Sequence, residues 1–470
     1  MLLSFLVALS VILTISIWFG EKLWSLDYSF FSDFSLLPSK NTTQNRNATN
    51  AQSVLGMPKS ILVSSNGLKN VLDPSSEGFL SLWKSTKSSL GIFLSSSDKQ
   101  KIRVDEKRWK SVLQGDGIYV DYKANYSTEF LAQNYHCDDH IDSYVFNAIL
   151  IKPPDPESDQ YSFLFQDVTT GNIYEFYVSD PQLHLLPANY LPADAANQNQ
   201  SFSFEINFDK PNQENSPSAQ QVMIDSMVLL NLNADQKPVI TPINPLLTSQ
   251  GDLNETLVNK VAMLFNVNPQ TTRKFTDEDQ SITFVENYAV LKIHADGYIE
   301  YHTTDESAAP ALDNPKGGSY GTVYAASQFI DTIITATDCQ NQLMLTSDLT
   351  KAPTNGDITM SYDYKINAIP VILSVASSSH DSIEKAVEIQ IRNNKIVSYK
   401  HYLRHYAITS ANAELSSSIT ALDKLLADQH SAAQMTISDM SPVYWDDANT
   451  ALLNPRWYIR LNNNKSIVLN

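Results

Sequence analysis

The sequence YAVLKIHADGYIEY, residues 288–301, carries the clearest structural signal in the chain. Strand-like runs rich in apolar and aromatic residues, 288–293 and 298–301, lie on the two sides of Asp296-Gly297. An Asp-Gly pair accepts the positive φ angles that a tight hairpin turn demands. We therefore predict an antiparallel hairpin here, and we interpret the rest of the chain outward from it.

The segments on either side of this hairpin alternate between helix and strand patterns. A helix is predicted at 253–265, with Asn254 as its cap, and a second at 320–337, where apolar residues form one stripe. Strand patterns follow at 344–349, 358–375, 386–391 and 395–402, then a helix at 413–426 and strands at 443–444 and 457–461. Toward the N-terminus, helical spacing at 78–90 accompanies strand patterns at 60–64, 117–121, 144–151, 161–166, 173–178, 202–208 and 227–232.

The first residues of the chain have a different character. Residues 2–19 (LLSFLVALSVILTISIWF) contain no charged side chain. Eighteen helical residues rise about 27 Å, which is close to the thickness of the hydrocarbon core of a bilayer. We predict a transmembrane anchor, with Trp18, Phe19 and Trp24 at the membrane interface. A cleaved signal peptide is the alternative, but its apolar region is shorter and ends in small residues, whereas this one ends in Trp18-Phe19.

The predicted anchor also has a candidate surface for contact with other membrane helices. Small residues allow helix backbones to approach closely in lipid, although they are common in any anchor helix. The candidates recur at every fourth position and are interrupted by one isoleucine: Ser4, Ala8, Ile12, Ser16 and Gly20. No basic residue precedes the helix, and we expect a cytoplasmic N-terminus with the bulk of the chain extracytoplasmic.

These patterns predict an α+β protein: one N-terminal transmembrane helix followed by a multi-domain extracytoplasmic region of antiparallel sheets with packed helices. The predicted divisions are an anchor with its flank at 1–24, a juxtamembrane segment and flexible linker at 25–58, and α+β domains at 59–186, 187–312 and 313–470.

Composition excludes several classes of function. The formal net charge of −18 would repel nucleic acid, and 22 Tyr and 19 Phe are incompatible with global disorder. The two cysteines, Cys137 and Cys339, cannot form a disulfide scaffold, although one bridge between them is possible.

The chain contains few patterns that could support catalysis or metal binding. The segment 136–140 (HCDDH) has metal-ligating residue types, but a solvated loop explains it better, and His401 and His405 fit paired surface aromatics in a strand. Ser81-Leu82-Trp83-Lys84 matches Ser-x-x-Lys without its companion motifs. Asp446-Asp447 is interpreted as a charged turn rather than a glycosidase pair. We expect no catalytic residue, cofactor, metal or small-molecule substrate.

Five stretches, taken in order, resemble the YycH family of regulators from low-GC Gram-positive bacteria. They are 2–18, then 264–303 around the hairpin, 362–374 (YDYKINAIPVILS), 386–406 (AVEIQIRNNKIVSYKHYLRHY) and 442–460 (PVYWDDANTALLNPRWYIR). The last three resemble the C-terminal domain that YycH shares with its sister protein YycI. The chain departs from the family in lacking a short basic start.

The resemblance implies a non-catalytic, single-pass protein of the cell membrane that pairs with a YycI-like sister protein as a heterodimer. It also implies contact with the sensor histidine kinase WalK (YycG), largely through transmembrane helices, and hence control of cell-wall metabolism through the WalK–WalR two-component system. A cell-wall-acting hydrolase displayed on the membrane, or a wall-binding or adhesion module, remains the alternative.

Overall fold

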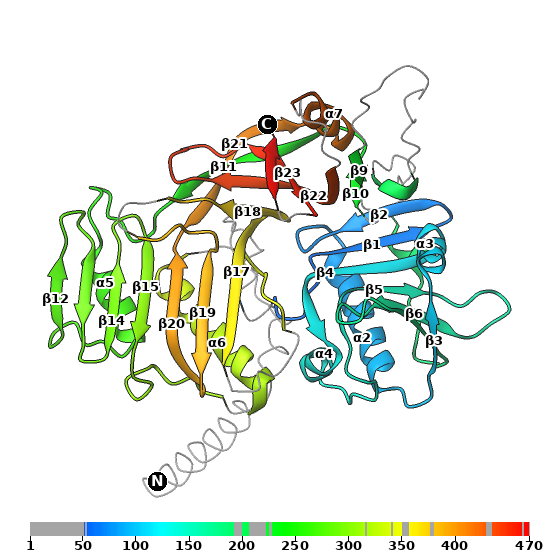
Figure 1. Cartoon of the computed structure of the whole chain (residues 1–470), viewed down its shortest axis with the longest axis horizontal. Helices are drawn as coiled ribbons and strands as arrows, with labels where there is room; N and C mark the ends of the chain where they lie inside the picture. The colour runs from blue at the N-terminus through cyan, green and yellow to red at the C-terminus, as the bar shows by residue number, and fades with distance from the viewer. Residues whose placement is uncertain are drawn as a thin grey trace, which may run out of the picture. The chain divides into compact units, whose positions relative to one another are not determined.

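A computed structural model provides the structure of the protein (Figure 1). It describes residues 51, 54–191, 200–205, 222–224, 228–314, 317–339, 342–349, 357–376, 380–428, 435–462 and 465–469. Within these ranges no helix is both long enough and apolar enough to cross a bilayer. The predicted anchor at 1–24 lies outside the described residues, as does most of the predicted linker.

The N-terminal part folds around a seven-stranded antiparallel sheet, in the order β2-β1-β4-β5-β6-β7-β3. Its strands are β1 (Ser60–Ser65), β2 (Leu68–Leu72), β3 (Gln100–Val104), β4 (Gly117–Ser127), β5 (Val145–Lys152), β6 (Tyr161–Gln166) and β7 (Ile173–Val178). Its helices are α2 (Phe79–Ser95), α3 (Glu106–Gln114) and α4 (Thr128–Tyr135). We call this sheet, which corresponds to the predicted domain at 59–186, the first sheet.

Both faces of the first sheet are buried. Alternate residues of β1 divide between two cores: Ile61 packs with α2 and α4, and Leu62 packs with α3. The α2 side is rich in aromatic rings, and Phe93 of α2 stacks on Phe163 of β6 with 4.5 Å between centroids. On the α3 side, the short strands β8 (Gln200–Phe202) and β10 (Leu229–Asn231) pair with each other, and Phe202 joins that core. Residues from the predicted central domain therefore complete the core of the first sheet.

The remainder of the chain builds a 13-stranded sheet, here called the large sheet. Its strands are β9 (Val222–Ile224), β12 (Arg273–Thr276), β13 (Ile282–Val285), β14 (Ala289–Ile293), β15 (Tyr298–Thr303), β16 (Gln342–Leu345), β17 (Ile358–Ile366), β18 (Ile369–Leu373), β19 (Val387–Arg392), β20 (Lys395–Tyr402), β22 (Met435–Asp446), β23 (Pro455–Leu461) and β24 (Ser466–Leu469). Strand β15 pairs with β20, so the sheet continues across the predicted domain boundary at 312/313. The division into domains stays a prediction.

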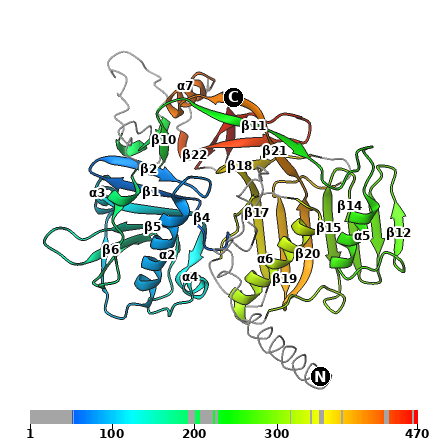
Figure 2. The same cartoon turned by 180° about the vertical axis from the view of Figure 1, so that it is seen from behind.

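One face of the large sheet carries helices. Figure 2 shows α5 (Glu255–Leu264) and α6 (Gly318–Ala336) on the same side of its strands. In β19 the burial alternates strictly, with the valine and isoleucines buried and Glu388, Gln390 and Arg392 exposed. The helix α7 (Ser418–Asp428) packs in a separate small core against β22 and β23, and β11 (Asp235–Ile243) pairs with β21 (His405–Leu415).

Most predicted elements are present, and the mixed α+β class with antiparallel sheets is confirmed. Asn254 caps α5, as predicted, by accepting hydrogen bonds from the backbone N–H groups of Thr256 and Leu257. The predicted hairpin is formed by β14 and β15, but its turn is wider than expected. Only Gly297 has a positive φ, 94°, while the Asp296 carboxylate accepts the Tyr298 N–H at 3.0 Å. A longer loop with one left-handed glycine replaces the two-residue turn.

Three element predictions are wrong in their bounds. The predicted strand 358–375 is a hairpin, β17 and β18, whose turn is Asn367-Ala368. The predicted helix 413–426 starts later, at Ser418, because β21 extends to Leu415 through its pairing with β11. The predicted strand 202–208 is short: β8 ends at Phe202, and a 3-10 turn over Ser203–Glu205 follows.

The last residues of the predicted linker are packed against the core. Ala51, Val54 and Leu55 are buried. The Ala51 N–H donates to the Asp331 carboxylate of α6 at 2.5 Å. Gly56 has a positive φ of 65°, and its N–H donates to the Tyr126 hydroxyl of β4 at 3.2 Å. The chain is thus attached to both sheet regions before β1 begins.

Candidate functional site

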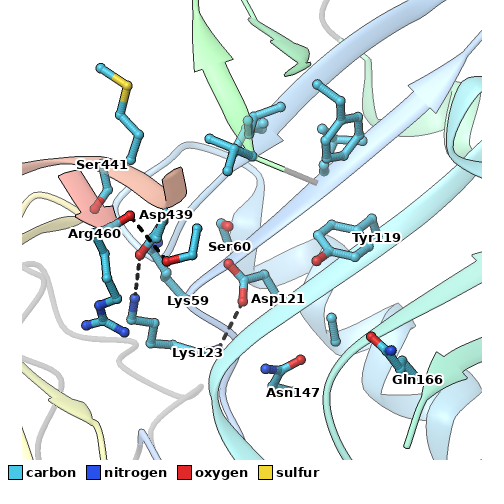
Figure 3. A pocket seen from close by; sticks show the side chains of 18 of the residues that line it. Lys59, Ser60, Tyr119, Asp121, Lys123, Asn147, Gln166, Asp439, Ser441 and Arg460 are labelled. Atoms are coloured by element: carbon cyan, nitrogen blue, oxygen red, sulfur yellow. Dashed lines mark hydrogen bonds and ion pairs between the residues drawn. The ribbon is translucent and has the colours of Figure 1, made fainter. Parts of the chain in front are cut away.

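A cleft of about 1190 Å³ lies beside the first sheet, between α3, the β8–β10 pair and strands β22 and β23 (Figure 3). It is lined by strands β1 and β4 of the first sheet and by β22, β23 and the β17–β18 turn of the large sheet. A cleft formed by two separate sheets is a common location for a binding site. We therefore treat it as the candidate site.

One end of the cleft is charged. The Lys123 ammonium of β4 lies 3.0 Å from the Asp439 carboxylate of β22, which joins the first sheet to the large sheet. Lys59 and Arg460 line the same end, and Asp121 accepts the Lys123 backbone N–H at 3.0 Å. Among the described residues, neither the Lys59 ammonium nor the Arg460 guanidinium has an ion-pair partner within 4.0 Å. With Asp73, which also lines this end, three cations and three carboxylates lie close together here.

The Asp439 carboxylate stays ionised in this setting. Burial alone would raise its pKa, but the positive charges of Lys123 and Lys59, helped by the Lys123 hydrogen bond, hold the pKa below its usual range. A general acid needs the opposite shift, toward a raised pKa. Asp439 is accordingly suited to holding cations in place and not to donating a proton.

The other part of the cleft is apolar and aromatic. Trp109 of α3 meets Tyr119 of β4 edge to face at 6.4 Å, and Tyr119 meets Phe202 in the same way at 6.1 Å. Ile173 and Leu229 are half-buried beside them. The cleft thus offers a hydrophobic wall and a charged end to one ligand, the combination expected of a site that binds an amphipathic molecule.

Sequence patterns did not predict this site. The two members of its central ion pair are 316 residues apart, and neither belongs to a motif. One local signal is the left-handed backbone of Lys123, with φ 69°, but this is visible only in the structure. Such a conformation in a residue other than glycine often occurs at functional positions.

The structure does not bring the candidate metal-ligating and catalytic residues of the sequence together. Residues 137–140 follow α4 as a loop, and no three His, Cys, Asp or Glu side chains in the described ranges are placed to hold a metal ion. Cys137 and Cys339 form no disulfide with each other. Ser81 and Lys84 are exposed on α2, while Trp83 between them is buried.

The interpretation of His401 as a surface residue is wrong. It is fully buried in β20, where its two ring nitrogens bond to the hydroxyls of Tyr364 (3.0 Å) and Tyr399 (2.8 Å). His405 is half-buried at the start of β21. Asp446 is also buried, and it accepts the Tyr406 hydroxyl at 2.7 Å. The polar groups of His401 and Asp446 are thus paired with tyrosine hydroxyls inside the protein.

The predicted membrane contacts remain predictions. All of the candidate positions, Ser4, Ala8, Ile12, Ser16, Gly20, Trp18, Phe19 and Trp24, lie outside the described residues.

Known proteins match this chain in structure and not in sequence. No protein-family profile matches the sequence, and no curated protein sequence matches it. A crystal structure of YycH from Bacillus subtilis aligns with a TM-score of 0.55 and 14% identity, over 92% of this chain and 99% of that one. At this identity the likeness shows the fold and nothing finer. The chain has the fold of YycH along nearly its whole length, which confirms the resemblance at the level of structure.

Proposed function

We propose that this protein is a membrane-anchored, non-catalytic regulator of a sensor histidine kinase of the WalK type. The observation that carries the proposal is the extent of the match: 99% of YycH from Bacillus subtilis is covered by this chain. The uncharged segment at 2–19 adds the anchor that such a regulator needs. A YycI-like sister protein is the expected heterodimer partner on the extracytoplasmic side.

The proposed mechanism is a shift between two states of the kinase. A regulator that contacts one state better than the other changes their populations by its differential binding free energy. A coupling of about 1–3 kcal/mol changes that balance by roughly 5- to 150-fold. Close packing of the small-residue stripe of the anchor against kinase helices would supply this energy.

The test replaces the stripe and leaves the rest of the chain intact. Leucine at Ser4, Ala8, Ser16 and Gly20 should abolish regulation of WalR-dependent transcription, because bulky side chains prevent close helix approach. Leucine at Ser10 and Thr14, on the opposite side of the predicted helix, is the matched control and should preserve regulation. Equal transcription in both variants, at equal membrane abundance, would contradict helix contact.

Crosslinking in membranes tests the partners directly. Photo-crosslinkers placed at positions 8 and 10 should capture a histidine kinase from the first position and not from the second. Capture of neither a kinase nor a YycI-like protein would contradict the assignment. Release of soluble fragments from purified peptidoglycan by the full chain would instead support the alternative of a wall hydrolase.

A further inference from the structure

The turn between β14 and β15 is bonded to side chains from two distant parts of the chain. The Asp296 carboxylate lies 2.7 Å from Nε2 of His380, which belongs to the connection between β18 and β19. The Asp296 carbonyl oxygen accepts a hydrogen bond from the Arg404 guanidinium. Asp296 thus connects the hairpin turn to residues 84 and 108 positions away in the sequence.

Both ring nitrogens of His380 face oxygen acceptors. Nε2 contacts the Asp296 carboxylate, and Nδ1 lies 2.8 Å from the carbonyl oxygen of Asp381. Neither a carbonyl oxygen nor an ionised carboxylate has a proton to donate. A neutral imidazole carries one N–H group, whereas an imidazolium carries two. Only the charged form of His380 therefore satisfies both contacts, because the neutral form would set a nitrogen lone pair against an oxygen.

The His380 ring covers two aromatic side chains of the large sheet. It meets His294 edge to face with 5.1 Å between centroids, and it lies tilted against Tyr298 at 4.7 Å. Tyr301 stacks on Phe265 next to α5, so Tyr298, three residues earlier in the same strand, points to the opposite face. His294 and Tyr298 are nevertheless only 1% and 3% exposed. Contact with His380 accounts for part of this burial.

Only one of the two histidines is suited to carry a charge. Neither ring nitrogen of His294 has a hydrogen-bond partner among the residues described. Burial, followed by the positive charge of Lys292 and the proximity of His380, lowers the pKa of His294 to about 4. His294 is therefore neutral at pH values well above 4, and the positive charge of the pair belongs to His380.

The charged groups on the elements around His380 are mostly acidic. The cations are Lys292, Lys385, Lys400 and Arg404, and the carboxylates are Asp277, Asp279, Asp296, Glu300, Asp363, Asp381, Glu384 and Glu388. Lys292 is paired with Asp277, and Lys385 with Asp363. The excess of carboxylates favours the protonated form of His380.

The connection that carries His380 is anchored separately at its base. Val375 and Ile383 exchange two backbone hydrogen bonds, at 2.9 and 3.2 Å, and Ile383 is buried. The Lys385 ammonium lies 3.1 Å from the Asp363 carboxylate of β17. None of these contacts involves Asp296. Loss of the His380 contacts would therefore release residues 380–382 and leave the chain from Ile383 onward in place.

We propose that His380 is a pH-operated latch, which as an imidazolium holds residues 380–382 against the Asp296 turn and, on losing its proton as pH rises, releases them and uncovers Tyr298 and His294. Histidine suits this role because its charge changes between about pH 5 and 8. The latch is closed in mild acid and open in mild alkali. It is separate from the anchor contacts of the proposed function, and its test does not depend on kinase regulation.

The test is hydroxyl-radical footprinting of the purified full chain in detergent, at about pH 5.5 and about pH 8.5. Mass spectrometry should show about threefold more oxidation of Tyr298 at the higher pH, since losing a charge-assisted hydrogen bond changes the closed-to-open ratio by roughly tenfold. Tyr301, buried on the opposite face of β15, should not change. General loosening in acid would act in the opposite direction. Equal Tyr298 oxidation at both pH values, or more in acid, would overturn the proposal.

Variants locate the titrating group. His380→Gln is neutral at every pH and should show the same raised oxidation of Tyr298 at both pH values. Asp296→Asn keeps an oxygen to cap the turn but removes the charge, so it should lose most of the pH step. His302→Gln removes an exposed histidine of β15 and should keep the full step. Thermal unfolding at both pH values checks that each variant is folded. A pH step retained in His380→Gln and Asp296→Asn, or lost in His302→Gln, would show that His380 is not the latch.

Discussion

The two sheets bury polar groups in different ways. In the first sheet, which is covered on both faces, Glu175 is fully buried and is held by the Arg108 guanidinium at 2.6 Å and by the Ser162 hydroxyl at 2.8 Å. In the large sheet, one of the buried polar residues is an uncharged histidine, His401, between two tyrosines. These two side chains differ in charge: Glu175 is ionised inside the first sheet, and His401 is neutral inside the large sheet. The two regions should therefore respond differently to mutation and to pH.

The largest difference is expected from removing one apolar side chain on each sheet. Phe93→Ala should cost about 3–5 kcal/mol, because the fully buried ring stacks on Phe163 and leaves a cavity. Val290→Ala, on the water-facing side of β14, should cost less than about 1 kcal/mol, since Val290 is 42% exposed. Urea unfolding followed by circular dichroism measures both. Similar losses would contradict one-sided burial of the large sheet.

The second difference concerns pH. Burial lowers the pKa of His401 to about 3. An unfolded histidine binds a proton below about pH 6.5, so the native state is fully stabilised above that pH and loses about 1.4 kcal/mol per unit as pH falls toward 3. Between pH 6.5 and 4.5 the loss is roughly 2.3 kcal/mol. His401→Gln should remove the part of this slope that His401 contributes, and the part due to His294, whose pKa burial lowers to about 4, should remain. Unfolding in urea across the pH range measures both.

Glu175 provides the contrast for this pH series. Burial would raise its pKa, but the Arg108 and Ser162 hydrogen bonds outweigh burial and lower it. Its contribution to stability is present above the pKa of an unfolded glutamate and is lost only as pH falls through the lowered native value. Hydrogen exchange at pH 5 should therefore show the large sheet losing protection before the first sheet. The reverse order would contradict these assignments.

The smallest effect is expected at the β17–β18 turn. Ala368→Gly should raise stability by about 0.5–1 kcal/mol, because glycine adopts φ 68° without strain. Gly171→Ala is the opposite change in the first sheet, at φ 71°, and should lower stability by a similar amount. Thermal unfolding compares the two. A loss of stability in Ala368→Gly would show that the turn is not strained.

Local sequence patterns identify some strands of the two sheets and miss others, for physical reasons. Strict alternation predicts β19 as a strand with one solvent-exposed face, and the Asp296-Gly297 pair predicts the hairpin of β14 and β15. The turn at Asn367-Ala368 contains neither glycine nor proline, and the hairpin it forms was therefore read as one strand. The end of β21 pairs with a strand about 180 residues earlier, and such pairing overrides local helical preference.

The candidate site was beyond sequence reasoning for a related physical reason. Lys59 precedes β1, Lys123, Asp439 and Arg460 lie in ordinary strands, and only tertiary packing brings the four charges together. Local periodicity reports which face of an element is buried and carries no information on which distant elements meet. The resemblance to YycH supplied the fold but assigned no role to these four positions.

The attachment of residues 51–56 has a mechanical consequence. Ala51 is fixed to α6, and the Leu55 carbonyl is fixed to Asn134 of α4 at 3.0 Å. Gly56 is required there, since a methyl group at its Cβ position would collide with the Asn134 side chain. A pull or twist arriving along the chain from its N-terminal side would thus load helices from both sheets at once. Such a load would reach α4 and α6 together through residues 51–56.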